Sequence, residues 1–233
     1  RMYATIKFFL FTMAGSIMLM LAILYLGWQG GTFALPELIA ARESFAAAQS
    51  WLFLAFALAF AVKVPIWPLH TWLPDTYTEA PAAGTAILAG VLAKMGAYGL
   101  LRFNLPLFPE ASLQFAPWMA GLAVVGILYG AVVAFAQRDV KRLVAYSSIN
   151  HMGFVVLGIA AAAYTWNTTS AQTILDRNIA LNGAVLQMFN HGLSSAGMFF
   201  LVGVIYDRTH TRNLKEMGGL YAILPVYGTV LIF

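Results

Sequence analysis

Hydrophobic residues in this chain are grouped into long segments separated by short polar stretches. Six of these segments are each long enough for a membrane-crossing helix, which needs about 20 residues. Their expected bounds are 8–26, 49–73, 82–103, 115–136, 143–165 and 179–205, and a further apolar run starts near residue 220. The pattern predicts an all-α membrane protein, a polytopic bundle of transmembrane helices.

The composition agrees with this fold class. The chain is 61% hydrophobic and only 9% charged, whereas soluble domains carry about 25% charged residues. The apolar runs are longer than the strands of a membrane barrel, so helices are expected. There is no cysteine, which excludes disulfides and iron–sulfur ligation in this chain. No phosphate-binding glycine loop, Ser-His-Asp arrangement or haem ligand set is present, so we expect no redox centre here.

Lysine and arginine residues orient the spans. If the spans alternate, eight of these cations fall on one side and only three on the other, apart from two inside the spans. By the positive-inside rule the richer side is cytoplasmic. Because this placement follows membrane topology, the net charge of +4 of the whole chain needs no nucleic-acid partner. The longer connections are 27–48, with a surface helix expected around 36–48, and 166–178. The cytoplasmic cations are Arg1, Lys7, Arg138, Lys141, Arg142, Arg208, Arg212 and Lys215, and those opposite are Arg42, Arg102 and Arg177.

The two lysines inside the spans are Lys63 and Lys94. A cation within the bilayer costs several kcal/mol, so we interpret both as functional. A desolvated lysine can also lose its proton, which arginine cannot readily do. The alternatives are a Lys63 that snorkels to the interface and a Lys94 that pairs with a buried carboxylate. Because no acidic residue lies in the core of a span, the partner of Lys94 is expected to be water, a histidine or a residue outside this sequence.

Two prolines follow Lys63 in the run VKVPIWP, at positions 65 and 68. Proline removes an amide donor and clashes with the preceding helical turn. We therefore predict a broken helix between Lys63 and Pro68, whose freed carbonyls need other partners. A helix broken at membrane depth beside an ionisable residue is typical of ion transporters. Further along, Asp75 and Glu79 either attract protons at an entrance or cap the following helix.

Two histidines, His151 and His191, lie in the middle of spans. Ser147 shares a helix face with His151, and Gln187 and Ser195 share one with His191. Polar stripes of this kind face the protein interior, and histidine suits a proton relay near neutral pH. Hydrogen bonding that only holds helices together is the alternative. Metal ligation is not expected, because no carboxylate or second histidine stands at ligand spacing.

A weak internal similarity links the first and sixth spans, aligned on Ala14-Gly15 and Ala196-Gly197. Spans five apart cross in opposite directions, which is the arrangement of an inverted-topology repeat. The same reading comes from a family likeness. The segment KVPIWPLHTWLPDTYTEAPAAGTAILAGVLAKMGAYGLLRF closely resembles the antiporter-like membrane subunits of respiratory complex I, and among them the M-type. The stretches RDVKRLVAYSSINHMGFVVLGIA and FNHGLSSAGMFFLVGVIYDRTHTRNLKEMGGL extend the resemblance over nearly the whole chain.

The resemblance implies two inverted five-helix repeats. Residues 1–103 would supply the last three helices of the first, and 115–233 the opening helices of the second, so the chain would be an internal part of a longer subunit. It also implies a proton relay through Lys63, Lys94, His151 and His191. The glutamate that pairs with the broken-helix lysine would lie before Arg1, and the outlet residue after Phe233.

The function implied is proton translocation by a subunit of an NADH:quinone oxidoreductase, coupled to electron transfer elsewhere in the complex. NADH, FMN, iron–sulfur clusters and quinone would belong to partner subunits and none to this chain. Neighbouring membrane subunits and the lipid bilayer would be its partners, in the bacterial inner membrane or an organellar energy-transducing membrane. A subunit of a sodium/proton antiporter is the second reading, and a purely structural subunit the third.

Overall fold

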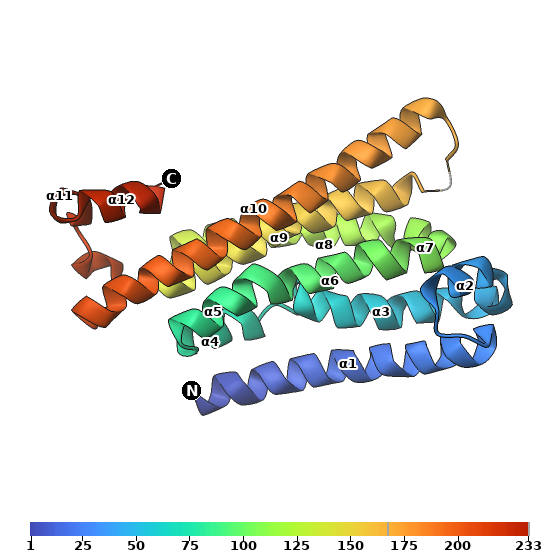
Figure 1. The fold of residues 1–233 in the computed structure, drawn as a ribbon, viewed down its shortest axis with the longest axis horizontal. Helices are drawn as coiled ribbons and strands as arrows, with labels where there is room; N and C mark the ends of the chain where they lie inside the picture. The colour runs from blue at the N-terminus through green and yellow to red at the C-terminus, as the bar shows by residue number, and fades with distance from the viewer. Residues whose placement is uncertain (167, 233) are drawn as a thin grey trace.

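The computed structural model describes residues 1–166 and 168–232. Within them, six helices are long and apolar enough to cross a membrane, and they run side by side with short connections at both ends (Figure 1). Their bounds are Met2–Gly30, Arg42–Lys63, Ala82–Leu107, Pro109–Phe135, Val140–Tyr164 and Ala171–Thr209. Large apolar side chains are exposed on the outer faces, as expected where helices meet lipid. The predicted all-α polytopic membrane fold is confirmed.

The first connection contains the predicted surface helix as two short pieces. Helix α1 (Met2–Gly30) stops at Gly31, whose φ of 66° is a left-handed conformation that glycine adopts without strain. Helix α2 (Leu35–Ala40) and the 3-10 segment η1 (Arg42–Ala48) follow, and the chain then enters α3 (Gln49–Lys63).

The helix that carries Lys63 is broken where the prolines predicted. Helix α3 ends at Lys63, residues 64–71 form turns, and the short helix α4 (Trp72–Glu79) resumes the direction. The ring nitrogen of Trp72 donates to the carbonyl of Val62 at 2.8 Å, and the amide of Ile66 donates to the carbonyl of Ala61 at 2.8 Å. Part of the backbone that the break exposes is therefore satisfied inside the protein.

The next span is one rod with two wider turns. It runs through α5 (Ala82–Ile87), η2 (Leu88–Leu92), α6 (Ala93–Gly99), η3 (Leu100–Asn104) and α7 (Leu105–Leu107). Both η segments are π-helical, and they flank the short α6 that carries Lys94. Single π-helical turns occur frequently at functional sites. The hydrophobic pattern did not predict them.

Helices α8, α9 and α10 each begin before their apolar runs do. The last two also have side-chain caps that the hydrophobic pattern did not predict. Helix α8 (Pro109–Phe135) starts six residues before 115, with a proline at its first position, where the missing amide donor is harmless. Asp139 caps α9 (Val140–Tyr164) by accepting from the Lys141 amide at 2.8 Å. Ser170 caps α10 (Ala171–Thr209) by accepting from the Thr173 amide.

The early start of α10 corrects the expected loop 166–178, most of which is helical. A helix of 39 residues is about 58 Å long at about 1.5 Å per residue, so α10 extends well beyond a bilayer core of about 30 Å. The expected run from residue 220 is also divided, into α11 (Leu220–Ile223) and α12 (Pro225–Ile232). Asn167 of the expected loop and Phe233 lie outside the described residues.

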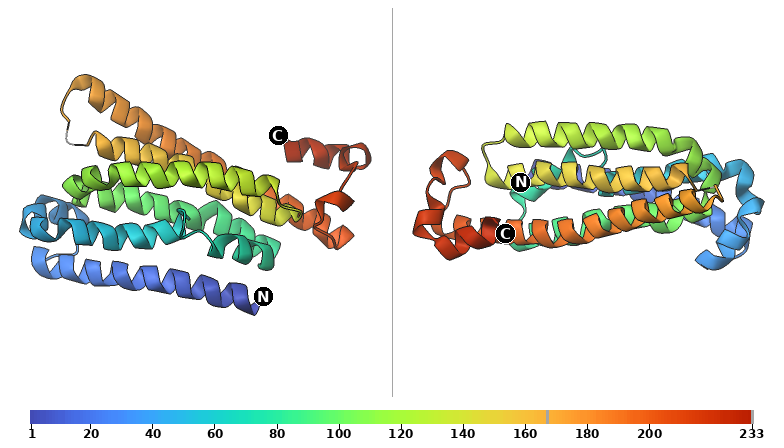
Figure 2. Two further views of the ribbon diagram at one scale, coloured as in Figure 1. Left: turned by 180° about the vertical axis from the view of Figure 1, so that it is seen from behind. Right: turned by 90° about the horizontal axis from the view of Figure 1, so that it is seen from above.

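Helix α9 is the most buried of the six spans and lies between α8 and α10 (Figure 2). Helix α10 packs on its other side against α5 and η2, and α6 packs against α3. A polar residue on α10 can therefore contact side chains of both α9 and the Lys94 rod. The inverted repeat of 1–103 and 115–233 remains a prediction.

Candidate functional site

Two glycines bring α10 against the rod that carries Lys94. A Cβ atom added at Gly192 would lie 3.1 Å from the carbonyl oxygen of Gly90, closer than most real contacts of this kind. The same added atom would lie 3.8 Å from the Lys94 side chain. The glycine pair thus sets the close approach at which Lys94 Nζ lies 2.5 Å from His191 Nδ1.

The surroundings of this contact are neutral. Lys94 Nζ also donates to the carbonyl of Ala89 at 2.6 Å, in the π-helical turn η2. Ser195 Oγ donates to the carbonyl of His191 at 2.5 Å, on the next turn of α10. His191 is 4% exposed, and its Nε2 has no hydrogen-bond partner among the described residues. No Asp or Glu side chain of the described residues forms an ion pair with Lys94. Of the three partners that the sequence allowed, water, a histidine or a residue outside it, the structure shows a histidine.

His151 lies next to His191 across the contact of α9 with α10. The two imidazole rings are 5.4 Å apart between centroids and inclined at 41°. Gln187 Nε2 lies 3.2 Å from His151 Nδ1. One complete span separates the helices of Lys94 and His151 in the sequence. The structure gives the order Lys94, His191, His151, since α10 supplies the intermediate ring.

The expectation that all four residues face an interior is met unevenly. His191 is buried, and Lys63 and Lys94 are half-buried. His151 is exposed at the surface of the described chain, although its ring lies against His191. The contacts of His151 agree with an inward role, but its exposure does not.

Lys63 reaches the same region from α3. A Cβ atom added at Gly96 would lie 2.9 Å from the carbonyl oxygen of Phe60 and 3.0 Å from Lys63 Cβ. Only glycine allows α6 to approach the end of α3 so closely. Among residues 1–166 and 168–232, Lys63 Nζ makes no hydrogen bond or ion pair. The structure therefore places Lys63 against the helix of Lys94.

A second polar region lies at the end of the bundle that the positive-inside rule predicts to be cytoplasmic. Asp75 of α4 accepts from Lys7 of α1 at 2.8 Å and from Arg142 of α9 at 3.3 Å. Asp139 pairs with Arg212 at 3.1 Å. Helix α5, which follows α4, has Pro81 at its N-cap and no side-chain cap, so the reading of Asp75 and Glu79 as caps is wrong.

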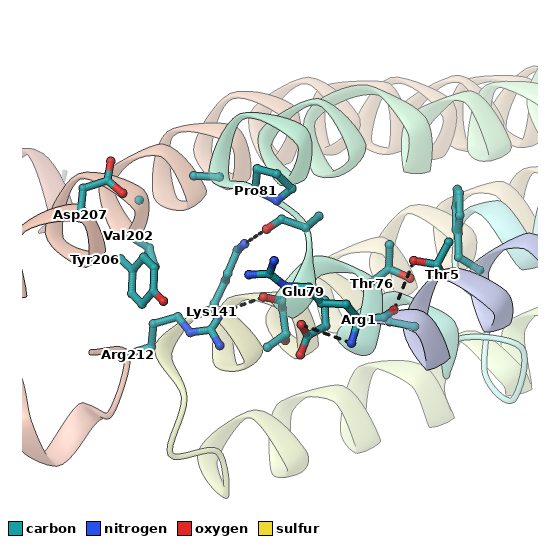
Figure 3. A pocket seen from close by; sticks show the side chains of 16 residues that line it. Arg1, Thr5, Thr76, Glu79, Pro81, Lys141, Val202, Tyr206, Asp207 and Arg212 are labelled. Atoms are coloured by element: carbon teal, nitrogen blue, oxygen red, sulfur yellow. Dashed lines mark hydrogen bonds and ion pairs between the residues drawn. The ribbon is translucent and has the colours of Figure 1, made fainter. Parts of the chain in front are cut away.

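Lys141 and Arg212 donate to backbone carbonyls at the end of α4, beside a cavity of about 620 Å³ (Figure 3). Lys141 Nζ donates to the carbonyl of Ala80, and Arg212 donates to the carbonyl of Thr78 at 2.6 Å. Carbonyls at a helix end carry partial negative charge, which cations stabilise. Lys141 is 5% exposed, so it is more than the topology charge that its sequence position indicated. No sequence signal predicted these contacts, because the partners are far apart in the chain.

Sequence reasoning also missed the burial of His70. It lies in the interruption between α3 and α4, is 2% exposed, and stacks edge to face on Tyr129 of α8 at 5.0 Å between centroids. Neither ring nitrogen has a partner among the described residues. No group of three His, Asp or Glu side chains in that part of the chain is arranged to hold a metal ion.

A helical membrane bundle with a broken helix and a lysine–histidine contact inside it defines a polytopic integral membrane protein of the antiporter-like class. The family model for the transmembrane region of the NADH:quinone oxidoreductases and Mrp antiporters matches residues 1–233. The chain belongs to this family.

One curated relative is NADH-quinone oxidoreductase subunit M of Pseudomonas aeruginosa, 44% identical over 238 residues, which cover 100% of this chain and 44% of the relative. A chain of respiratory complex I from Thermus thermophilus with bound NADH matches with a TM-score of 0.83 and 34% identity, over 98% of this chain and 46% of that one. A chain of the Mrp complex from Dietzia has a TM-score of 0.81 at 20% identity, over 99% and 40% of the two chains, which shows the shared fold alone.

The chain spans less than half the length of the relatives it matches. Its six apolar helices and its family make it an integral membrane protein. The bacterial relatives support a location in the bacterial inner membrane.

Proposed function

We propose that this chain is the middle of the M-type membrane subunit of a proton-pumping NADH:quinone oxidoreductase. In this proposal the proton relay runs from Lys63 to Lys94, His191 and His151. The observation that carries it is the 2.5 Å contact between Lys94 Nζ and His191 Nδ1, made without a carboxylate. The 44% identity to a subunit M over the whole chain supports the same assignment.

A lysine that faces a neutral imidazole can pass its proton on. The ammonium group donates to the bare Nδ1, and after transfer the imidazolium donates from Nδ1 to the amine, so one hydrogen bond serves both states. A carboxylate at this place would stabilise the ammonium form and hold the proton on lysine. The neutral surroundings of Lys94 therefore favour a proton that moves.

Lys63 would drive this transfer electrostatically. Two positive charges a few ångströms apart in a poorly polarisable interior repel by several kcal/mol, enough to move a proton from one base to another. Lys63 stands at the broken end of α3, against the helix of Lys94. A change in its charge would push the proton of Lys94 toward His191.

The energy would come from electron transfer in partner subunits, which would hold NADH, FMN, iron–sulfur clusters and quinone. Neighbouring antiporter-like subunits would pass the change in charge along the membrane. In the proposed subunit, residues 1–103 end the first five-helix repeat and 115–233 open the second.

The alternative is a subunit of a multisubunit cation/proton antiporter, favoured by the shared fold of the Mrp chain. The higher identity of the complex I chain, 34% against 20%, favours the oxidoreductase. A third possibility is that the polar residues only hold helices together.

The test uses the complete complex, purified and placed in liposomes with a pH-sensitive dye inside. Lys94→Met should abolish the proton uptake that NADH and quinone drive, while the complex still assembles. Lys215→Met is the matched control, since it makes the same chemical change at an exposed position, and it should pump normally. Normal pumping by Lys94→Met would refute the relay. Proton transport that depends on a sodium gradient and not on NADH would favour the antiporter.

A further inference from the structure

Gln187 contacts the imidazole ring of His151, which is the histidine of the pair that does not contact Lys94. We propose that Gln187 is a positioning residue that sets the tautomer of His151 and thereby decides whether His151 can take up a proton from His191. This inference rests on the proposed function and concerns its last described step. It assigns Gln187 a role in proton transfer, although the residue itself carries no proton.

Among the polar side chains near His151, Gln187 is the one placed to hydrogen bond to its ring. It lies one helical turn before His191 on α10, and its Nε2 is 3.2 Å from His151 Nδ1. The other polar side chains near His151 on α9 are already engaged. Ser147 donates to the carbonyl of Val144 at 2.8 Å, and Asn150 donates to the carbonyl of Ile127 at 2.7 Å. Among the described residues, Gln187 is the side chain that hydrogen bonds to the His151 ring.

An amide suits this role because it can donate or accept. When its NH2 group donates to His151 Nδ1, that nitrogen is bare and the ring carries its proton on Nε2. When the amide turns by half a rotation, its oxygen accepts from Nδ1–H and Nε2 is bare. Only the second arrangement leaves His151 a free base on the nitrogen that Gln187 does not contact.

The proton count follows from these two arrangements. A proton leaves Lys94 Nζ for His191 Nδ1, and the proton on His191 Nε2 leaves that ring. It reaches the bare Nε2 of His151 across a ring spacing of 5.4 Å, which a direct contact or one water can bridge. His151 then becomes an imidazolium whose Nδ1–H is donated to the Gln187 oxygen. Lys94 is left neutral and His191 is left as its Nδ1–H tautomer.

Few charged groups lie near His151, so few other groups affect its protonation. His191 faces it from α10, and Lys94 lies behind His191 on α6. Helix α8, which packs on α9, has Glu110 in its first turn as its one acidic residue and no Lys or Arg. Its Tyr129 stacks on His70 and on Tyr146 rather than on His151. A change in the pH dependence of pumping on mutation of Gln187 would therefore report on the histidine pair.

Two substitutions in the complete, liposome-reconstituted complex test the proposal. Gln187→Met keeps the size of the side chain and removes the hydrogen bond, and it should slow proton uptake about three- to tenfold, the worth of one neutral hydrogen bond. Gln187→Glu supplies a permanent acceptor for Nδ1–H and stabilises the imidazolium. It should move the pH dependence of uptake toward higher pH, because the carboxylate holds the proton on His151 more tightly. Gln172→Met makes the same change on the exposed start of α10 and should have no effect.

The outcomes separate this inference from the function on which it rests. If Lys94→Met blocks pumping while Gln187→Met pumps like Gln172→Met, Gln187 has no role and only the inference fails. If the Met and Glu variants are slowed equally, with the wild-type pH dependence, Gln187 only packs the helices and the inference again fails. If Lys94→Met itself pumps normally, the proposed function fails.

Discussion

Cations in the middle of this bundle and cations at its charged end have different kinds of partner. At the end, Lys7 and Arg142 both pair with Asp75, and Arg212 pairs with Asp139. In the middle, Lys94 faces a neutral imidazole and a backbone carbonyl, with no carboxylate among the described residues. The end carries charges that are held in place, whereas the middle carries a charge with a second base beside it.

An ion pair at Lys94 would prevent transfer of its proton. Opposite charges stabilise each other's ionised forms, so a paired lysine keeps its proton. A neutral histidine accepts the same hydrogen bond and can also accept the proton itself. The paired region ties α4 to α1 and α9, and it supports the broken helix on which the unpaired region depends.

The largest effect is expected from His191→Gln. The amide can still accept from Lys94, but it cannot take the proton, so pumping should fall about 100-fold or more, as for loss of an acid–base group. Proton uptake by the reconstituted complex measures this. Pumping within a factor of two of wild type would show that the lysine–histidine contact is only structural.

A smaller loss is expected from Lys63→Ala. Removing this charge would remove the proposed repulsion between Lys63 and Lys94, and about tenfold slower pumping corresponds to about 1.4 kcal/mol of lost coupling. The complex should still assemble. Lys63→Arg should rescue poorly, because arginine holds its proton. Normal coupled pumping in assembled Lys63→Ala would refute the assignment of Lys63.

Gly192→Ala should lengthen the distance between Lys94 and His191 without removing any ionisable group. The added methyl group meets the carbonyl of Gly90 at 3.1 Å, so α10 should move away from η2 and lengthen the contact of Lys94 with His191. We expect pumping to slow about threefold to tenfold, the range for one weakened hydrogen bond. Gly197→Ala on the same helix adds its methyl group to open space and is the matched control. Equal rates in the two variants would show that the close approach is unimportant.

The smallest effect on pumping is expected in the paired region. Asp75→Asn weakens two partly exposed ion pairs, so stability should fall by about 1 kcal/mol, with pumping reduced less than twofold. Thermal dissociation of the purified complex would reveal the loss. Asp176→Asn, which removes an exposed carboxylate hydrogen-bonded to Gln172, is the control. A strong pumping defect without lost stability would mean that the two regions are not distinct.

Much of the fold and part of the site could be predicted because their causes are local. A run of apolar residues predicts a span wherever it occurs, and the prolines at 65 and 68 break the helix at Lys63 through their own rings. The two lysines and two histidines could be chosen because a polar group in a span is costly by itself. Glycines such as Gly90 and Gly96 beside Lys94 permit close helix packing, but the sequence does not say which helix packs against them.

The sequence by itself thus determined six apolar helices, the break after Lys63 and the residues worth testing. Only the tertiary structure decided that His191 stands between Lys94 and His151, that Gln187 contacts the His151 ring, and that Lys141 and Arg212 meet the end of α4. Lys94 and His191 are 97 residues apart. Their contact depends on which helix faces of α6 and α10 pack together, and that is settled by the fit of all the helices at once and by no local pattern.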